Sequence, residues 1–341
     1  KQNIEWLKIP PSTALQQTLR NLDHSLKQSF KNANSRKGFP TFKKKKFNST
    51  SFNLTMISSN NFINDNIFKI PKIGEVKIKL HRKPPSDFKS CAVKQKAGKW
   101  YVSFVVKKEC KQKQPISSAI GIDMNSKDLV VTSESEVIKN PKFYSKTKSR
   151  IKWLQKALAR KKLGSQNWHK ALLKLQRAYD KMGNQRSDHL HKLSRYLVDN
   201  YDLIAMEDLN VAGMAKFNGH MVQDAGWSML RSMILYKSEL EGKETVIIDR
   251  WYPSTKTCSG CGNIQDMKLS DRVYSCDKCG LVIDRDLNSA YNILKEGIGQ
   301  EVPEYKPVEI PLSGNQNIDS RYVSLKQEQD LTTIAVGCYG L

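Results

Sequence analysis

The spacing of hydrophobic positions changes along the chain, and each change marks a different kind of element. Near the start, Pro10 and Pro11 precede a stretch in which Ser12 can act as a helix cap. Apolar residues then recur at three- and four-residue steps, at Leu15, Leu19, Leu22, Leu26 and Phe30. This spacing places one apolar stripe on a helix, so it predicts that residues 1–37 are helical.

Residues 47–107 follow the two-residue period of β-strands instead. Apolar and polar residues alternate in two runs, one at Phe52, Leu54 and Met56, the other at Val76, Ile78 and Leu80. Ala97 and Gly98 separate two further β-rich runs and predict a hairpin turn. The stretch therefore predicts a small β-barrel with a helical insertion or flank.

The composition shifts at Pro115, and from there short apolar strands alternate with helices. The pattern predicts strands over 119–122, 128–133, 203–206 and 245–248, and helices over 143–200, 223–242 and 286–295. We expect breaks in the long helical region near Gly164 and Gly183, because glycine lowers helix stability. This alternation indicates an α/β domain.

The charge balance gives the first indication of function. The chain has 341 residues, 39% of them hydrophobic, which is enough for a core and for two or three domains. Lys and Arg number 57 against 33 Asp and Glu, a formal net charge of +24. Such an excess favours a polyanionic partner, and a phosphate backbone is the natural one. A basic protein with no partner and an anionic membrane surface are the alternatives. No apolar run approaches the roughly 20 residues that span a bilayer.

The positive charge is concentrated in two runs. Residues 31–46 carry seven basic groups and residues 139–162 carry ten, with no acid in either run. The residues that we expect to contact nucleic acid are Lys43, Lys44, Lys45, Lys46, Arg150, Lys161, Lys162 and Arg186. From residue 300 the balance reverses to six acids against three bases, so we expect the tail 299–341 to be disordered.

Four of the seven cysteines are clustered, at Cys258, Cys261, Cys276 and Cys279. They form two C-x-x-C pairs with fourteen residues between them, and a glycine follows each pair. Four thiolates complete the tetrahedral shell of a structural zinc ion and leave no position open for substrate. A redox role for one pair is the alternative, which two pairs at this spacing disfavour.

Three acids stand at the ends of predicted elements. Asp123 and Glu207 each end an apolar strand, and Asp286 opens a helix. Ligands of open α/β sheets collect outside the carboxyl ends of strands, so these acids can converge on Mg²⁺. Two such ions, about 4 Å apart, would support phosphodiester hydrolysis. A turn residue or a helix cap is the ordinary role of such acids, and Asp208 and Asp284 are adjacent competitors that the pattern does not separate.

Together these residues resemble the TnpB family, the transposase-like accessory proteins of insertion sequences, whose nuclease core type V CRISPR effectors share. G-I-D at 121–123 is similar to the family's first nuclease motif, and M-E-D-L-N at 206–210 resembles the second. D-R-D-L-N-S-A at 284–290 resembles the third motif, and N-x-R-x-D-x-x-H-K at 184–192 matches a family helix. The resemblance runs from about residue 6 to residue 298.

The resemblance implies an RNase H-like (RuvC-like) α/β nuclease core with an inserted zinc ribbon and an N-terminal β-barrel and helical region. It implies that Asp123, Glu207 and Asp286 are the catalytic acids, with Asp286 as the second aspartate of the D-R-D motif. The family is expected to be an RNA-guided DNA endonuclease of the cytoplasm and nucleoid, with an element-derived guide RNA, target DNA and no membrane partner. The implied regions are 1–115 (helix and barrel), 116–250 (core with a helical hairpin), 251–283 (zinc ribbon), 284–298 (final core helix) and 299–341 (tail).

Two departures from the family leave other functions open. Asn125 stands where relatives have glycine, and an N-terminal stretch that opens with β structure is absent, so we expect an N-terminally truncated chain. A non-cleaving RNA- or DNA-binding regulator of transposition is one alternative. A strand-transferring transposase is another, because this fold also serves that reaction.

Overall fold

The computed structural model describes residues 4–31, 39–41, 50–84, 88–113, 115–125, 127–268 and 270–301. The chain forms two compact units, one reaching to Lys108 and the other starting at Glu109. Over the described ranges, every helix is too short or too polar to serve as a bilayer span. The expected nucleic-acid contacts at Lys43, Lys44, Lys45 and Lys46, and the tail beyond Glu301, lie outside these ranges.

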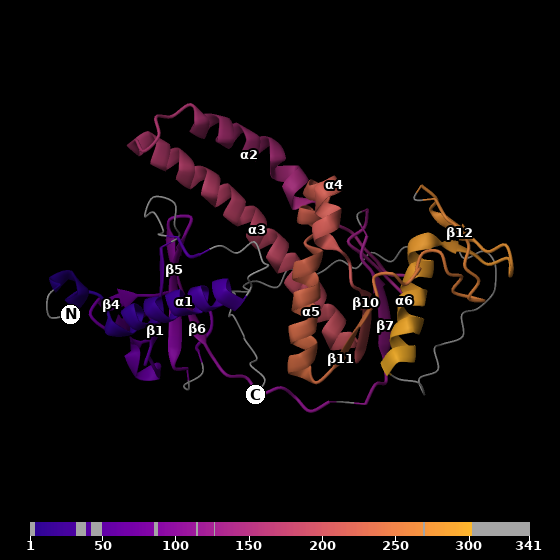
Figure 1. Ribbon diagram of the computed structural model, residues 1–341, viewed down its shortest axis with the longest axis horizontal. Coiled ribbons are helices and arrows are strands. Elements are labelled where there is room, and N and C mark those ends of the chain that lie inside the picture. Colours follow the sequence, from indigo (N-terminus) through magenta and orange to yellow (C-terminus); the bar gives the residue numbers. More distant parts are fainter. Residues whose placement is uncertain are drawn as a thin grey trace. The chain divides into compact units, whose positions relative to one another are not determined.

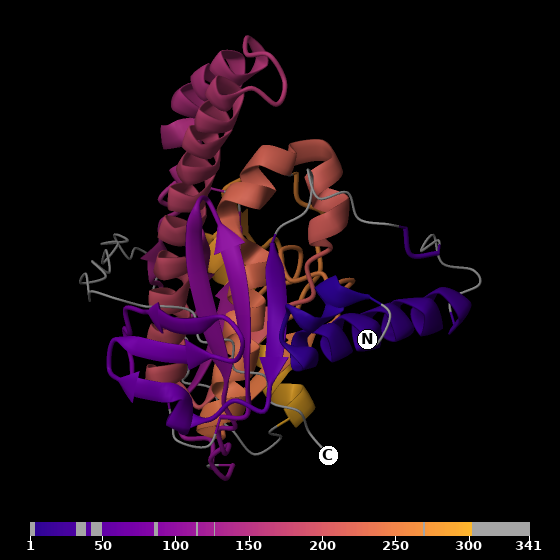
Figure 2. The ribbon, with the colours of Figure 1, turned by 90° about the vertical axis from the view of Figure 1, so that its left-hand side faces the viewer.

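The first unit combines a helix with two small antiparallel sheets. A 3₁₀ turn, η1 (Glu5–Lys8), precedes the expected helix, α1 (Ser12–Lys31). One sheet has the order β1-β5-β6, with β1 (Ser51–Thr55), β5 (Ser90–Lys96) and β6 (Lys99–Val105). The other has the order β2-β3-β4, with β2 (Phe62–Asn64), β3 (Ile67–Ile70) and β4 (Gly74–Lys77), after the short turn η2 (Ser59–Asn61). Figure 2 shows α1 beside the strands of the first sheet, where it packs on β1.

The predicted hairpin is confirmed and the predicted strand bounds are partly wrong. Ala97 and Gly98 both have positive φ, 49° and 78°, which is the backbone of a type I′ turn. Met56 has φ 61° and is 88% exposed, because β1 ends one residue earlier. The described strands pair as two separate sheets over one shared core, with Leu54, Ile57, Phe68 and Phe88 at its centre.

The second unit is built on one mixed sheet of order β11-β10-β7-β8-β9. Its strands are β7 (Ala119–Asp123), β8 (Val130–Thr132), β9 (Val137–Ile138), β10 (Leu203–Glu207) and β11 (Glu244–Ile248). β11, β10 and β7 are parallel, while β8 and β9 extend the sheet antiparallel. β7 and β10, the inner parallel strands, are almost wholly buried, as their apolar sequences require.

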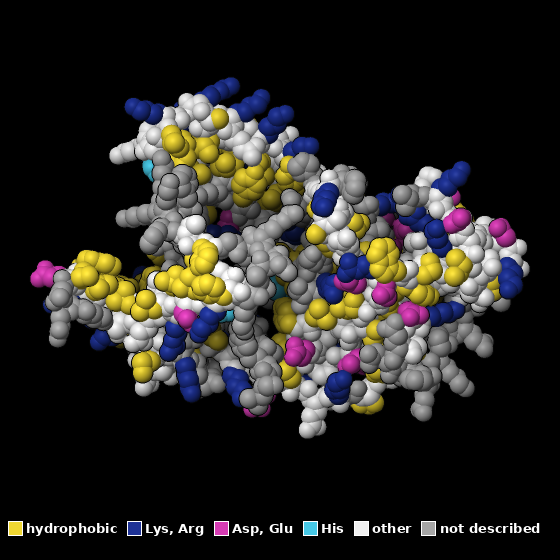
Figure 3. All heavy atoms as spheres, in the orientation of Figure 1, with side chains coloured by type: hydrophobic (Ala, Val, Ile, Leu, Met, Phe, Trp, Pro, Cys, Tyr) yellow, Lys and Arg dark blue, Asp and Glu magenta, His cyan; other side chains and the backbone are white. Residues whose placement is uncertain are grey.

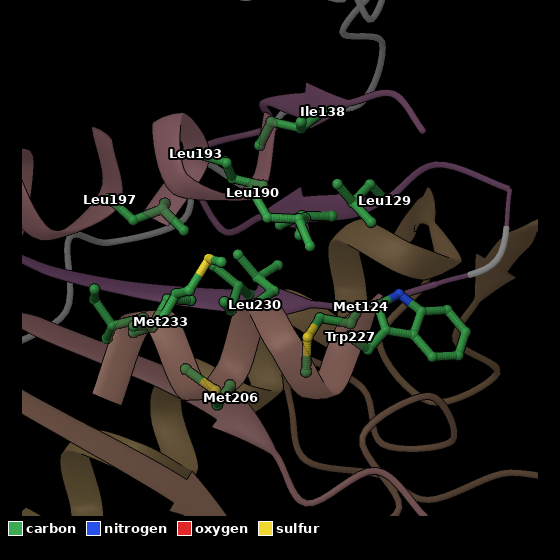
Figure 4. Close-up of a cluster of buried hydrophobic side chains, with 14 of the residues drawn as sticks. Met124, Leu129, Ile138, Leu190, Leu193, Leu197, Met206, Trp227, Leu230 and Met233 are labelled. Atoms are coloured by element: carbon green, nitrogen blue, oxygen red, sulfur yellow. The ribbon is translucent and has the colours of Figure 1, made fainter. Parts of the chain in front are cut away.

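Helices cover both faces of this sheet, α5 on one side and α6 on the other (Figure 1). Successive strand side chains alternate between the faces. Ile204 and Met206 pack with α3 (Gln166–Asn200) and α5 (Trp227–Glu241), where Leu190, Leu193, Trp227 and Leu230 meet them (Figure 4). Leu203 and Ala205 pack on the other face with Ile293 of α6 (Arg285–Glu301).

Two glycines let α6 lie directly on the sheet. A Cβ on Gly121 of β7 would come within 2.2 Å of the Ala290 carbonyl oxygen of α6. A Cβ on Gly297 of α6 would come within 2.6 Å of the Ala205 Cβ on β10. Helix and strands therefore approach more closely than any larger residues would permit, which brings the start of α6 to the ends of β7 and β10.

A helical hairpin extends from the sheet and differs from the expectation at two points. α2 (Phe143–Ala159) and α3 run side by side, joined by a turn in which Gly164 has φ 82° and Ser165 caps α3 (Figures 1 and 2). The predicted break at Gly183 is wrong, because an interior glycine costs only about 1 kcal/mol and α3 has a long packed face on either side. An unexpected helix, α4 (Val211–Ala225), precedes α5, and Gly226 at φ 69° divides the two.

Candidate active site and metal centre

Two of the three predicted acids lie side by side at the carboxyl edge of the sheet. β7 ends at Asp123 and β10 ends at Glu207. These strands are parallel, and Ile122 pairs with Met206, so Asp123 and Glu207 occupy the next position on neighbouring strands. Residues in register on parallel strands point to the same face. Both carboxylates therefore lie on the face that α6 covers.

Asp286, the third predicted acid, reaches them from the first turn of α6. Its Oδ2 accepts a hydrogen bond of 3.4 Å from Asn125 Nδ2, two residues beyond Asp123. Asp284 does something else, because its Oδ1 accepts the backbone N–H groups of Asp286 (2.9 Å) and Leu287 (3.1 Å). Asp284 therefore caps the helix, and it is the Asp286 carboxylate that lies with the other two acids.

Asp208, the other competing acid, is paired away from the three carboxylates. Its two carboxylate oxygens accept from Arg231 and Arg250, and these hydrogen bonds lower its pKa. The two arginines line a cleft of about 360 Å³ that also includes Glu207 and Trp227. Arg231 and Arg250 therefore lie beside the sheet edge at which β7 and β10 end.

The electrostatics of the three acids are those of an anionic cluster. Asp123 is 8% exposed and Asp286 is 7% exposed. Burial, followed by the charges of Glu207 and Asp286, raises the pKa of Asp123 to about 8 from a usual 3.8. Burial also raises the pKa of Glu207, and a hydrogen bond from Ser254 opposes that rise. Buried carboxylates that repel one another are an oxygen donor set suited to a hard divalent cation.

Two arginines lie beside the Asp286 carboxylate. Its Oδ1 accepts from Arg285 Nε (3.1 Å) and Nη2 (3.0 Å), and Arg272 Nη1 lies 3.8 Å from its Oδ2. Among the described residues, the four clustered thiols have ligand atoms that all lie within 4.8 Å of one another, and the three carboxylates are spaced more widely. The acids thus converge without the tight geometry of the thiols.

The four predicted cysteines form one compact ligand set. Sγ of Cys258 lies 3.6 Å from Sγ of Cys279, and Cys261 and Cys276 are also 3.6 Å apart. A tetrahedron with metal–sulfur bonds of about 2.3 Å has edges of roughly 3.8 Å, so the spacing fits one zinc-sized ion. Gly262 and Gly280, both at φ 75°, donate to the carbonyl oxygens of Cys258 and Cys276 and close the two turns. β12 (Val273–Ser275) and β13 (Val282–Asp284) carry the second turn between them.

Ser254 is a site residue that the sequence did not indicate. It is 4% exposed, its Oγ donates to Glu207, and it accepts from Ser289 Oγ at 3.0 Å. The residue belongs to an irregular loop between β11 and the first cysteine pair, with no motif around it that predicts a polar contact. Only the folded chain brings this loop, β10 and α6 together.

The basic residues predicted to contact nucleic acid fall into two groups. Lys161 and Lys162 are exposed in the turn between α2 and α3, and Arg150 lines a groove of about 740 Å³ along this hairpin. Figure 3 shows hydrophobic side chains gathered on the hairpin, with Lys and Arg side chains along its outer edge. Arg186 differs, because it is largely buried and lies 3.6 Å from the Asp224 carboxylate, which also accepts from the Tyr144 backbone N–H.

The same groove includes Trp153, whose side chain is 67% exposed. Its indole is open to solvent and shares the groove with Lys146, Arg150 and Lys174. An exposed aromatic ring between cations is the arrangement on which unpaired bases stack.

Known proteins resemble the chain over most of its length. The family model described as "Probable transposase" matches residues 103–218, and the model described as "Cas12f1-like, TNB domain" matches residues 227–293. A protein of Streptomyces pristinaespiralis named "Putative RNA-guided DNA endonuclease" is 34% identical over 87% of this chain and 74% of its own length. Its counterpart InsQ of Escherichia coli K12, which has the same description, is 30% identical over 86% and 76%. Among solved structures, a Cas12f1–sgRNA–target DNA complex aligns at a TM-score of 0.49 and 17% identity, over 78% of this chain and 67% of that one.

Proposed function

Because the chain belongs to the TnpB family, we propose that it is an RNA-guided DNA endonuclease of transposon origin whose cutting site is formed by Asp123, Glu207 and Asp286. The observation that carries the proposal is the meeting of two buried acids, Asp123 and Asp286, with the half-buried Glu207, from distant parts of the chain, at the carboxyl edge of one sheet. The mixed sheet with helices on both faces supports an RNase H-like core.

Asp123, Glu207 and Asp286 would hold two Mg²⁺ ions in this proposal. Such ions, when bound, supply an activated water and stabilise the leaving oxygen of a phosphodiester. The residues of the chain bind these ions and the substrate. The three carboxylates provide the negative charge, and the Ser254 hydroxyl donates a hydrogen bond to Glu207. Arg285 and Arg272 contact the Asp286 carboxylate. In this proposal they exchange that contact for a phosphate when the DNA strand enters.

The substrate strand is proposed to pass through the cleft beside Glu207. Arg231 and Arg250 line it and match the charge of a phosphate backbone. Trp251 follows Arg250, is 85% exposed, and offers a ring on which a base can stack. The groove of the helical hairpin, with Arg150 and Trp153, is the proposed site for a second length of nucleic acid, in which single-stranded guide RNA fits the stacking surface.

The cysteine cluster is proposed to hold structural zinc. Four thiols complete the shell, so no position remains for a reacting group. Its proposed role is to fix the loop that leads from β11 to α6.

The test is cleavage of a matched DNA target by the purified chain with RNA transcribed from the end of its element. We expect magnesium-dependent cleavage that is lost in Asp123→Ala. Asp266→Asn is the matched control, because the Asp266 side chain is 97% exposed and pairs only with Lys256 among the described residues. Cleavage by Asp123→Ala at the wild-type rate would overturn the proposal. Salt-sensitive RNA binding without cutting would identify a regulator, and joined DNA products would identify a strand-transfer transposase.

A further inference from the structure

Ser254 connects the helix that carries Asp286 to the carboxylate of Glu207. Ser289 Oγ donates to Ser254 Oγ at 3.0 Å, and Ser254 Oγ donates to Glu207 Oε1. Ser289 lies three residues after Asp286, so the two side chains share one face of α6. The pair of hydroxyls therefore runs from α6 to β10 and ends on one of the three acids.

The backbone of Ser254 is held by the same helix. Asn292 Nδ2 donates to the Ser254 carbonyl oxygen at 2.7 Å and to the Thr257 carbonyl oxygen at 2.6 Å. Ser254, Asn292 and Ser289 are all buried, so these contacts are shielded from water. Ser254 consequently has little freedom to move away from Glu207.

The cysteine site is tied into these contacts on both sides of Cys258. Asn288 Nδ2 donates to the Thr257 carbonyl oxygen at 2.7 Å, and Asn288 Oδ1 accepts from the Ser259 N–H at 2.9 Å. Asn288 has no exposed surface. One turn of α6 therefore contacts both the loop that carries Ser254 and the first cysteine pair, and links the two.

We propose that Ser254 is a positioning residue, which orients Glu207 for divalent metal and which α6 and the cysteine site hold in place. The Glu207 side chain has three rotatable bonds. The hydrogen bond from Ser254 to Oε1 fixes the conformation of this side chain and leaves Oε2 for a metal ion. The inference rests on the proposed function, because it takes Glu207 as a metal ligand. Loss of a hydrogen bond that supports a metal ligand typically lowers metal affinity about 10–100-fold.

The experiment is Mn²⁺ binding to the full chain, measured by the electron paramagnetic resonance signal of the free ion. It compares the wild type with Ser254→Ala and Ser289→Ala, and Asp123→Ala defines the binding that belongs to the acidic site. Ser238→Ala is the matched control, since Ser238 is buried in α5 and its hydroxyl has no hydrogen-bond partner among the described residues. Thermal melts and the bound zinc content are recorded for each variant.

We expect Ser254→Ala to weaken Mn²⁺ binding about 10-fold or more, Ser289→Ala to weaken it less, and Ser238→Ala to leave it unchanged. Ser289→Ala does not contact Glu207, so it carries the test if Ser254→Ala does not fold. Unchanged affinity in the folded Ser254→Ala variant, or in Ser289→Ala if that variant alone folds, overturns the inference and leaves the proposed function standing. Equal binding by the wild type and Asp123→Ala would instead refute the acidic metal site itself.

Discussion

Replacing Asp123 by asparagine should stabilise the protein in magnesium-free buffer, although it removes a proposed catalytic acid. The folded-state pKa of this carboxyl is raised to about 8 from 3.8, so the fold favours the protonated form. The unfolded chain loses this proton near pH 4, and stability therefore falls as the pH rises from about 4 to about 8. Asparagine resembles the neutral acid in shape and carries no charge at any pH.

The size of the effect follows from the shift. At pH 7 the unfolded carboxyl is ionised and the folded one holds its proton, so folding must take up a proton about three pH units above the unfolded pKa; at ~1.4 kcal/mol per unit this costs at most ~4 kcal/mol. A gain of about 2–4 kcal/mol should raise the melting temperature by roughly 5–15 °C in a domain of this size. The buffer must contain zinc and no chelator, so that the cysteine site stays filled.

The assay is a thermal melt of the wild type and Asp123→Asn, each with and without Mg²⁺ at pH 7. We expect the variant to melt higher than the wild type without Mg²⁺, and Mg²⁺ to raise the melting temperature of the wild type alone. Repeating the melt near pH 4 should remove the difference. A variant that melts at or below the wild-type temperature without Mg²⁺ would show that the fold does not disfavour the ionised form of Asp123.

Three further predictions concern other parts of the molecule. Gly121→Ala should destabilise the second unit by about 3 kcal/mol in urea unfolding, because its Cβ meets the backbone of α6. Trp153→Ala should weaken single-stranded RNA binding by about 1–3 kcal/mol in a filter-binding titration. Substitution of the neighbouring buried Leu154 removes no stacking surface, so it should not cause this loss of affinity. Burial lowers the pKa of Lys237 to about 8, so stability should rise between pH 8 and 10.5 by up to ~3 kcal/mol, and Lys237→Met should lack this rise in urea unfolding at the two pH values.

The strand ends were predictable because the parallel strands are simple in sequence. β7 and β10 are each a short apolar run that closes on one acid, and parallel neighbours end at the same edge. The choice between Asp284 and Asp286 was not accessible to spacing, since the two acids lie two residues apart at the start of the same helix. The structure separates them by the backbone N–H groups that Asp284 accepts, which is a property of the helix start and not of the motif.

Tertiary packing explains where the sequence misled. Gly183 lies in α3 between buried residues such as Met182 and Leu190, whose packing outweighs the helix penalty of one glycine. Gly226 does divide two helices, because its positive φ is incompatible with a continuing helix. The role of Ser254 could not be read from the sequence at all, since its partners come from β10 and α6.

A crystal of the chain grown with Mn²⁺ would show, through the anomalous scattering of the bound ions, whether the three acids hold metal together. We expect two peaks, both bounded by the carboxylates of Asp123, Glu207 and Asp286, with Glu207 still hydrogen-bonded to Ser254. Peaks elsewhere, or three carboxylates that turn to separate surfaces when Mn²⁺ is bound, would contradict the proposed metal site.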